Sequence, residues 1–382
     1  MSLKSNCTIP AVAAISLCLI GPTFPAAADI LHVPGDYPTI QEAINAATNG
    51  DEVEVHPGTY NETINFLGKA IRVYSSDGPD MTIIDGQQNG TVVTCTNGEG
   101  PETVIDGFTI TGGSGTNGGG MRNYQSSPTV INCIITDNTL YIEGGSAKGA
   151  GMSNVSSDPT VINCVFSQND ALNDCFAWGG GMYNLNSNPT VTNCTFDGNR
   201  AIGGGCAGNS VGEGGGMFND NSSPIVSGCN FSGNRASGGK DGGGGWGGGM
   251  YNVNGSAPAI TNCVFADNRG MFGGGIMNRF SSPTLNDCIF TGNLVFGDGK
   301  DYGFGAGMLN LFDSAPTIVN CTFSQNSAVS GGGGLNTFSG GNPAVSDSIF
   351  CGNTPENITG DYTDNGGICL ADPCDDANGD GI

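Results

Sequence analysis

Short runs of β-favouring residues recur along the chain, and stretches rich in Gly, Pro, Asn and Ser separate them. One unit returns between Gly118 and Asn353: Gly-Met-x-Asn, then Pro-x-Val, Asn-Cys-x-Phe and a final Asn. A repeat of this length is typical of a solenoid, in which each unit buries its apolar face against its neighbours. Short runs cut by turn residues predict strands and tight corners rather than helices. The central cysteines of the units lie 25 to 35 residues apart, at Cys133, Cys164, Cys194, Cys229, Cys263, Cys288 and Cys321, and Ser348 takes this place in the last copy.

Alternation along a strand predicts which side chains of a unit point inward. Met182 and Asn184 should face the interior and Tyr183 the outside, whereas Cys194 and Phe196 share the inward face. Stacked units then form a methionine column and an aromatic column. About eleven rungs at roughly 4.8 Å would make a rod on the order of 50 Å long. The predicted columns are Met121, Met152, Met182, Met217, Met250, Ile276 and Met308, and Ile135, Phe166, Phe196, Phe231, Phe265, Phe290, Phe323 and Phe350.

The final Asn of each unit predicts a buried amide ladder at bends of the chain. Asn tolerates left-handed backbone, and its amide can bond to the next rung. Such a column is stable only if every amide is paired, which stacking provides. The glycine triplets before each Met predict close backbone passage at a corner. A phosphate-binding loop would need a helix after the glycines, and here a strand follows. The ladder comprises Asn138, Asn169, Asn199, Asn234, Asn268, Asn293, Asn326 and Asn353.

Residues 1–28 have the pattern of a secretory signal. Lys4 precedes an apolar run from Ile9 to Ile20, and Pro25-Ala26-Ala27-Ala28 is a small-residue cleavage site. The run is short for a membrane span, and Leu17 before Cys18 is a poor lipidation context. We therefore expect a mature chain that starts near Asp29, is secreted or displayed at the cell surface, and has no integral membrane span.

Residues 38–47 predict one helix. Thr39 and Glu42 have capping-box spacing, and the apolar positions of the segment line one face. Placed at the end of a solenoid, this helix would cover the open strand edge. Less regular first coils are predicted from strands at 52–55, 71–74, 82–84, 92–94 and 103–110.

Composition agrees with one elongated domain. The 382 residues include 67 glycines and only 12% charged residues, and the formal net charge of -24 argues against nucleic acid or an anionic membrane as partner. We predict a β-helix over 29–353, with irregular coils at 51–117 and regular repeats at 118–353, followed by a tail at 354–382.

Three segments carry a family resemblance: Tyr37–Ile44, Pro57–Glu62 and Val104–Ile110. They resemble the opening of secreted pectin-lyase-like proteins, and the Gly-Gly-Gly-Met and Phe-x-x-Asn elements are similar to the repeats of polymorphic outer-membrane proteins, which are surface adhesins. The resemblance implies an all-β fold, the right-handed parallel β-helix. Enzymes of that family carry clustered aspartates on neighbouring rungs, or calcium with an Arg or Lys. The repeats show no matching cluster in sequence, so the catalytic residues of an enzyme would be unknown.

The chain has only two histidines, His32 and His56, both in the N-terminal coils. We interpret His56, beside Pro57-Gly58, as a turn residue. The cysteine column matches no zinc pattern, and two interpretations stand: free buried thiols or vertical disulfides. A loop disulfide between Cys175 and Cys206, and a tail disulfide between Cys369 and Cys374, would be further pairings.

Two outward columns predict binding. Tyr183, Phe218 and Tyr251 share an exposed slot beside long variable loops, predicted at 170–179, 201–214 and 236–247, which would wall a groove suited to sugar rings. The alternative is ordinary aromatic packing that includes Trp178 and Trp246. The second column is Arg200, Arg235 and Arg269, which would hold the carboxylates of an acidic polysaccharide, unless Asp197 and Asp267 neutralise it on the surface.

The tail ends in half of a calcium loop. Asp376, Asn378 and Asp380 take the first three ligand positions and Gly381 follows, but the chain stops before the carboxylate of position 12. Calcium is therefore the one expected cofactor. We expect this chain to be a fragment of a longer protein, with a C-terminal domain missing from it; the alternative is that the motif binds calcium weakly with outside help. The sequence favours a non-catalytic, adhesin-like rod that binds polysaccharide or another surface ligand along one face. The alternative is a lyase or glycoside hydrolase acting on an acidic glycan such as pectin.

Overall fold

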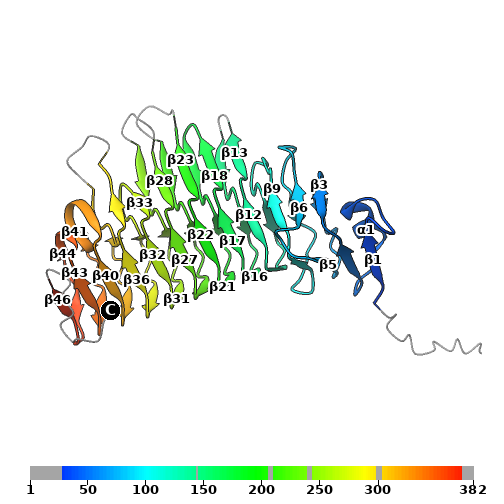
Figure 1. Cartoon of the computed structure of the whole chain (residues 1–382). Coiled ribbons are helices and arrows are strands. Elements are labelled where there is room, and N and C mark those ends of the chain that lie inside the picture. The colour runs from blue at the N-terminus through cyan, green and yellow to red at the C-terminus, as the bar shows by residue number, and fades with distance from the viewer. Residues whose placement is uncertain (1–27, 143–144, 205–209, 239–242, 298–302, 372–382) are drawn as a thin grey trace, which may run out of the picture.

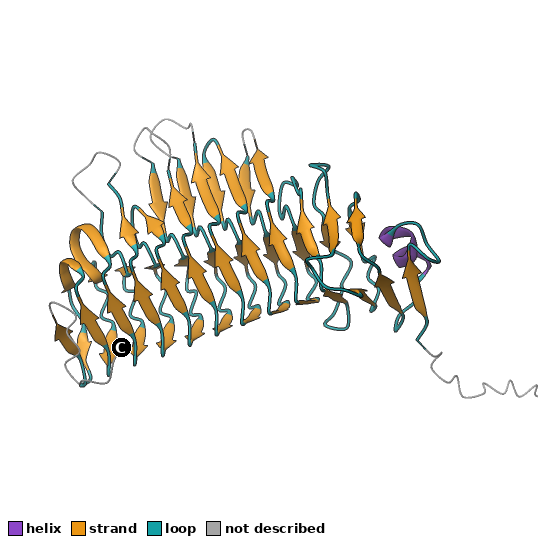
Figure 2. Cartoon of the chain, in the orientation of Figure 1, coloured by secondary structure: helices purple, strands orange, loops and turns teal. Residues whose placement is uncertain are grey.

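The chain folds into a long rod of stacked coils (Figure 1). The structure, a computed structural model, describes residues 28–142, 145–204, 210–238, 243–297 and 303–371. Successive coils pair in parallel and in register, so three sheets run the length of the rod (Figure 2). The all-β fold predicted from the repeats is therefore confirmed as a parallel β-helix.

The first sheet contains 13 strands, two more than the roughly eleven coils predicted. Its strands are β1 (Ile30–Val33), β2 (Glu52–Val55), β5 (Arg72–Ser75), β8 (Val104–Asp106), β11 (Thr129–Ile131), β16 (Thr160–Ile162), β21 (Thr190–Thr192), β26 (Ile225–Ser227), β31 (Ala259–Thr261), β35 (Thr284–Asn286), β39 (Thr317–Val319), β42 (Ala344–Ser346) and β45 (Thr363–Asp364). The second sheet contains β3 (Gly58–Tyr60), β6 (Thr82–Asp85), β9 (Thr109–Thr111), β12 (Ile134–Thr136), β17 (Val165–Ser167), β22 (Thr195–Asp197), β27 (Asn230–Ser232), β32 (Val264–Ala266), β36 (Ile289–Thr291), β40 (Thr322–Ser324), β43 (Ile349–Cys351) and β46 (Cys369–Ala371).

The third sheet has two strands per regular coil. One set carries the methionines: β4 (Ile64–Asn65), β7 (Val93–Cys95), β10 (Met121–Tyr124), β15 (Met152–Val155), β20 (Met182–Leu185), β25 (Met217–Asp220), β30 (Met250–Val253), β34 (Ile276–Arg279), β38 (Met308–Leu311), β41 (Ser327–Thr337) and β44 (Thr354–Thr359). The other set follows the ladder asparagines: β13 (Thr139–Ile142), β18 (Asp170–Asn173), β23 (Arg200–Gly203), β28 (Arg235–Ser237), β33 (Arg269–Gly270) and β37 (Leu294–Val295). A small fourth sheet contains β14 (Ser146–Lys148), β19 (Phe176–Trp178), β24 (Val211–Glu213) and β29 (Gly244–Trp246).

The predicted internal columns are confirmed. Each methionine pairs in register with the next, from Met121 to Met308 with Ile276 in line, and all are fully buried. The phenylalanine rings from Phe166 to Phe350 stack at 4.5 to 4.8 Å between centroids, and their planes lie within 5° of each other. The repeat period therefore fixes the register of the whole core.

The amide ladder is also confirmed. Each Nδ2 donates to Oδ1 of the next rung at 2.8 to 3.0 Å, from Asn138 to Asn353. The sequence predicted left-handed backbone at the ladder Asn itself. The left-handed residue is instead the one before it, such as Gly198 (φ 62°) or Gln168 (φ 51°). A second ladder of the same kind joins the inward asparagines of the methionine strands: Asn123, Asn154, Asn184, Asn219, Asn252, Asn278 and Asn310.

The glycine triplets connect the strands of the fourth sheet to the methionine strands, as residues 179–181 do between β19 and β20. Gly179 has a φ of 62°, and a Cβ on Gly181 would lie 2.6 Å from the oxygen of Gly216 and 2.9 Å from the ring of Phe196. The absence of a side chain therefore permits both the turn and the close stacking of coils.

The described part of the chain contains one helix, α1 (Ile40–Ala46), beside β1, β2 and β4. Its N-terminal N–H groups are capped by the Thr39 hydroxyl and by both carboxylate oxygens of Glu62, at 2.9 Å to Ile40 N and Gln41 N. Lys69 donates to three carbonyls at the other end. Ile40, Ala43 and Ile44 are thereby held in the core.

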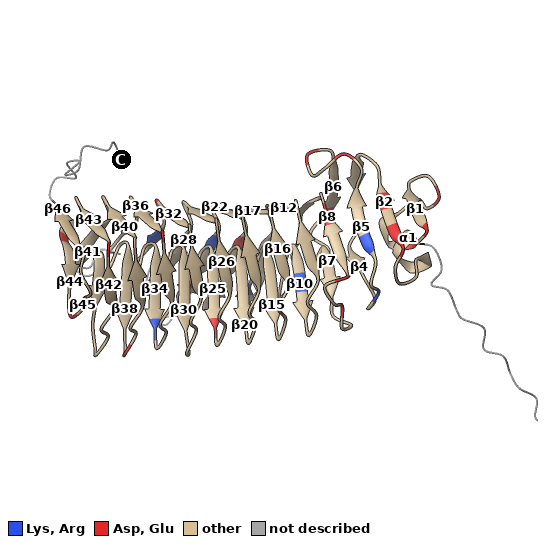
Figure 3. Ribbon diagram, turned by 90° about the horizontal axis from the view of Figure 1, so that it is seen from below, with Lys and Arg blue, Asp and Glu red and all other residues tan. Residues whose placement is uncertain are grey.

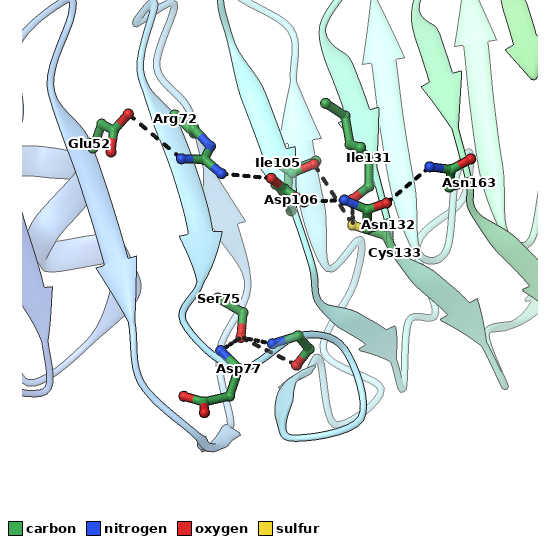
Figure 4. A network of polar contacts seen from close by, with 11 residues as sticks. Glu52, Arg72, Ser75, Asp77, Ile105, Asp106, Ile131, Asn132, Cys133 and Asn163 are labelled. Atoms are coloured by element: carbon green, nitrogen blue, oxygen red, sulfur yellow. Dashed lines mark hydrogen bonds and ion pairs between the residues drawn. The ribbon is translucent and has the colours of Figure 1, made fainter.

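Polar side chains also line the outside of the first sheet (Figure 4). Arg72 bonds to Asp106 at 2.8 Å, Asp106 accepts from Asn132 at 2.9 Å, and Asn132 accepts from Asn163 at 3.3 Å. Hydrogen bonds therefore connect consecutive coils on the surface as well as in the core.

The sequence predicted that the β-helix ends at residue 353, but it continues further. β44, β45 and β46 pair with β41, β42 and β43, so residues 354–371 add another coil. The open edges of the preceding strands supply hydrogen-bonding partners even though this segment lacks the repeat motif. Residues 1–27, which hold most of the proposed signal, lie outside the described residues.

The column cysteines are free buried thiols, one of the two predicted states. Cys175 is disulfide-bonded, as predicted for a loop cysteine, although the proposed partner Cys206 lies outside the described residues. Cys369 carries a free thiol and Cys351 is disulfide-bonded, so the predicted pairing of Cys369 with Cys374 is wrong.

Candidate functional site

The variable segments of the repeats form a projection from the rod, which we call the wing. β13, β18, β23 and β28 make one layer, and the fourth sheet makes the other. Small residues such as Ala171, Ala177 and Ala201 pack between the layers, and a Cβ on Gly212 would collide with the oxygens of Ala201 and Ser237. The segments predicted as loops are therefore paired strands, because alanine and glycine allow two layers to approach closely.

One face of the wing meets the outer face of the methionine strands, and the corner between them is a groove. Three columns in register define it. The wall is Lys148, Trp178, Glu213, Trp246, Phe272 and Phe304; the floor is Ser153, Tyr183, Phe218, Tyr251, Met277 and Leu309; and the rim is Val155, Leu185, Asp220, Val253, Arg279 and Leu311.

The groove contains a pocket of about 370 Å³ between Lys148 and Arg279. Lys148 Nζ lies 5.1 Å from the Trp178 ring centroid, and the Arg279 guanidinium lies 5.8 Å from that of Trp246. The pocket therefore has a cation at each end. Its lining comprises Lys148, Trp178, Tyr183, Leu185, Glu213, Phe218, Asp220, Tyr251, Val253, Asn254 and Arg279.

The aromatic slot predicted as exposed is covered. Tyr183, Phe218 and Tyr251 line the groove floor but are only 3%, 4% and 1% exposed. Trp178 packs over Tyr183 and Phe218 with ring centroids 6.3 and 6.1 Å apart, and Trp246 meets Tyr251 edge-on at 5.8 Å. The packing alternative is therefore correct for the floor. The aromatic surface open to a ligand belongs to the half-buried tryptophans of the wall.

A buried carboxyl group lies in the middle of the wall. Glu213 is 9% exposed, and the loss of hydration raises its pKa to about 7. The Trp178 indole and the Arg279 guanidinium act against this shift, whereas the charge of Asp220 adds to it. Glu213 therefore exchanges its proton near neutrality, close to a second carboxyl group on the rim.

Several polar atoms of the groove make no hydrogen bond of normal geometry in the described part of the chain, although the Trp178 indole lies near Glu213 and the Tyr251 hydroxyl near Arg279. These atoms are Nε1 of Trp178 and Trp246, the hydroxyl of Tyr251 and the hydroxyl of Ser153. Buried donors without acceptors cost free energy, and a ligand rich in hydroxyl groups would supply the missing bonds.

The arginine column is stacked as predicted, because Arg200 pairs in register with Arg235 and Arg235 with Arg269. It lies on β23, β28 and β33, apart from the residues that line the described pocket. Asp170 on the preceding coil, rather than Asp197, pairs with Arg200 at 3.1 Å. Arg235 lies 5.1 Å over the ring of Phe296. The predicted neutralisation thus occurs for Arg200, but from a different acid.

Sequence reasoning missed most of the groove: Lys148, Glu213, Asp220 and Arg279. The only sequence signal for these residues is their position relative to the internal methionine of each unit. Wall residues stand four places before the internal Met of each unit, and rim residues three places after it. The calcium ligands predicted at Asp376, Asn378 and Asp380 lie outside the described residues.

Comparisons with known proteins bear on the fold. Residues 173–306 match the family described as "Right handed beta helix region". The fold is a right-handed parallel β-helix. A search of the curated proteins finds no match to this chain. Within the described residues, the helical content is a single two-turn element, far too short to cross a membrane.

Similar solved structures include three carbohydrate-active enzymes at low identity. Carrot pectin methylesterase is 11% identical, with 92% of this chain and 89% of that chain covered and a TM-score of 0.34. The catalytic domain of a GH87 alpha-1,3-glucanase is 13% identical over 92% and 67%, with a TM-score of 0.42. A pectin methylesterase from Erwinia chrysanthemi is 10% identical over 89% and 93%, with a TM-score of 0.32. At these values the similarity concerns the fold alone.

Proposed function

We propose that this chain is a secreted or cell-surface rod that binds a polysaccharide in the groove beside the wing. The observation that carries the proposal is the pocket between Lys148 and Arg279, where aromatic rings and unsatisfied hydrogen-bond donors occur together. Sugar rings have apolar faces that pack on aromatic rings and hydroxyl groups that accept from indole N–H groups. The signal-like segment at 1–28 supports export.

The charges of the groove indicate which sugars fit. Lys148 and Arg279 lie at the ends of the pocket, and Glu213 and Asp220 lie between them. The centre therefore suits uncharged, hydroxyl-rich rings, since a sugar carboxylate would meet two acids there. Carboxylates are favoured only beside the terminal cations or on the separate arginine column.

Replacing the wall tryptophans tests the binding site. Trp178→Ala and Trp246→Ala should each weaken polysaccharide binding about tenfold, because each removes an aromatic face open to the ligand. Binding is measured by retention on a glycan array and by titration calorimetry. Tyr141→Ala is the matched control, since Tyr141 is 66% exposed on β13, on the opposite face of the wing. Equal binding by all variants would exclude the groove as the site.

Glu213 favours a second candidate function, hydrolysis of a glycan in the same groove. A carboxyl with a pKa near 7 can act as a proton donor, and Asp220 is a second carboxyl in the same pocket. The sequence alone did not show this pair beside Tyr183, Phe218 and Tyr251. Binding is the better supported function, because the tryptophans and the unpaired donors occupy several coils of the groove, whereas catalysis rests on Glu213 and Asp220 alone.

A turnover assay separates the two functions. The purified chain is incubated with neutral and acidic glycans, with and without calcium, and reducing ends and unsaturated products are followed. A binding rod should release no products while it retains the glycan. Products that disappear in Glu213→Gln and Asp220→Asn, but persist in Glu102→Gln at an exposed site, would identify an enzyme instead.

A further inference from the structure

The two histidines of the chain meet on the outer face of the first sheet, far from the groove. His32 lies on β1 and pairs in register with Glu54 on β2, and His56 comes directly after β2, two residues beyond Glu54. Alternate residues of a strand share a face, so Glu54 and His56 point to the same side. A chain with only two histidines, 24 positions apart, thus brings both of them to one carboxylate.

The three side chains are close enough to share one ion. Their ligand atoms all lie within 4.8 Å of one another, and His32 Nδ1 lies 2.8 Å from Glu54 Oε2. The imidazole rings are nearly parallel, with centroids 6.1 Å apart. The His32 side chain is 44% exposed and that of Glu54 is 24% exposed, so an ion from solvent can reach them.

We propose that His32, Glu54 and His56 bind a divalent transition metal ion, with Zn²⁺ as the best-matched example. Two imidazole nitrogens and one carboxylate oxygen form a ligand set that zinc uses in open sites, where water completes the coordination. Calcium and magnesium prefer oxygen ligands alone, and two of the three groups here are nitrogen donors.

The surroundings favour a cation. Glu52 and Asp36 lie near the cluster, and the Asp36 carboxylate accepts a hydrogen bond from the backbone N–H of His32 at 3.0 Å. Acidic residues also lie on β2 (Figure 3). Arg72, on the neighbouring strand β5, is bonded to Asp106 at 2.8 Å and lies 3.7 Å from Glu52. Ser76 Oγ, 3.4 Å from His56 Nδ1, helps to orient that ring.

Only small side-chain movements are needed for binding. Zinc–ligand bonds of about 2.0–2.2 Å require ligand atoms roughly 3.3 Å apart, and separations up to 4.8 Å close by rotation of partly exposed side chains. The backbone is already fixed, because β1 and β2 pair over four residues. This arrangement predicts a preorganised, surface-accessible site.

The test is a zinc titration of the purified chain without a polyhistidine tag. Because the chain has two histidines, imidazole nitrogen NMR gives two sets of signals, and both should shift as one equivalent of Zn²⁺ is added. Calorimetry should show that His32→Ala, His56→Ala and Glu54→Gln each weaken binding on the order of 100-fold or more, since even outer-shell groups cost 10- to 100-fold.

Two controls exclude general attraction to an acidic surface. Glu52→Gln removes a neighbouring carboxylate from the same strand and should change zinc affinity less than about threefold. Ca²⁺ should leave the imidazole signals in place. Unmoved imidazole signals with zinc, or zinc binding that survives both histidine substitutions, would show that His32 and Glu54 form a surface ion pair only.

Discussion

Asn234→Leu should lower the free energy of unfolding by about 4 kcal/mol, because several buried groups lose their partners together. Asn234 Nδ2 donates to Asn268 Oδ1 at 2.9 Å and to the oxygen of Phe196 at 2.8 Å. Its Oδ1 accepts from the N–H and from Nδ2 of Asn199, at 3.1 and 3.0 Å. Leucine has the same branching and the same number of side-chain heavy atoms as asparagine, but it has neither donor nor acceptor and its methyl groups are larger. Urea unfolding followed by circular dichroism measures the loss.

The matched control is Asn230→Leu, the same substitution on the same coil. Asn230 begins β27 and its side chain is exposed. We expect a change within about 0.5 kcal/mol, as for most surface substitutions. Equal destabilisation by both variants would mean that β-propensity, rather than the ladder, decides the outcome.

Glu213→Gln should stabilise the chain at about pH 8 but leave its stability nearly unchanged at about pH 4. In the folded chain the pKa of Glu213 is about 7, above its ordinary value of 4.5, because the carboxylate is buried. Between these values the folded state holds a proton that the unfolded state has released, so stability falls as the pH rises. The full effect is about 3 kcal/mol, and glutamine, which has no charge to bury, does not show it.

Melting temperatures of both proteins between pH 4 and pH 8 test this linkage. Glu102→Gln, at an exposed position, should reproduce the pH profile of the unmodified chain. A constant difference between the unmodified chain and Glu213→Gln across this range would show that Glu213 is charged and hydrated in the folded state.

The repeat made the core predictable. Met182, Phe196 and Asn199 recur with the same identity on nearly every rung, and parallel in-register stacking requires equivalent residues to lie in columns. A buried column must pack apolar side chains on apolar ones and pair every amide, so each rung carries the same residue type and the sequence predicts these columns correctly. The stacking of the cysteines was predicted in the same way, but the repeat did not decide between free thiols and disulfides, and the structure shows free thiols.

The groove was less predictable because its wall residues occupy the same position in each repeat but differ in residue type. Lys148, Trp178, Glu213 and Trp246 have no chemistry in common, although each stands four residues before an internal methionine. The segments that carry them are rich in glycine and alanine, which is typical of loops, and here allows the two layers of the wing to pack. Sequence pattern predicted a bordered groove but could not show that the tryptophans cover its aromatic floor.

Tryptophan fluorescence tests the central claim most directly, because the only two tryptophans of the chain, Trp178 and Trp246, stand in the groove wall. Polysaccharides are titrated into the purified chain while the emission is recorded. The proposed function predicts a saturable change in emission that follows the binding measured by calorimetry and is reduced in each tryptophan variant. Polysaccharide binding with unchanged tryptophan emission would place the ligand elsewhere on the rod and contradict the account.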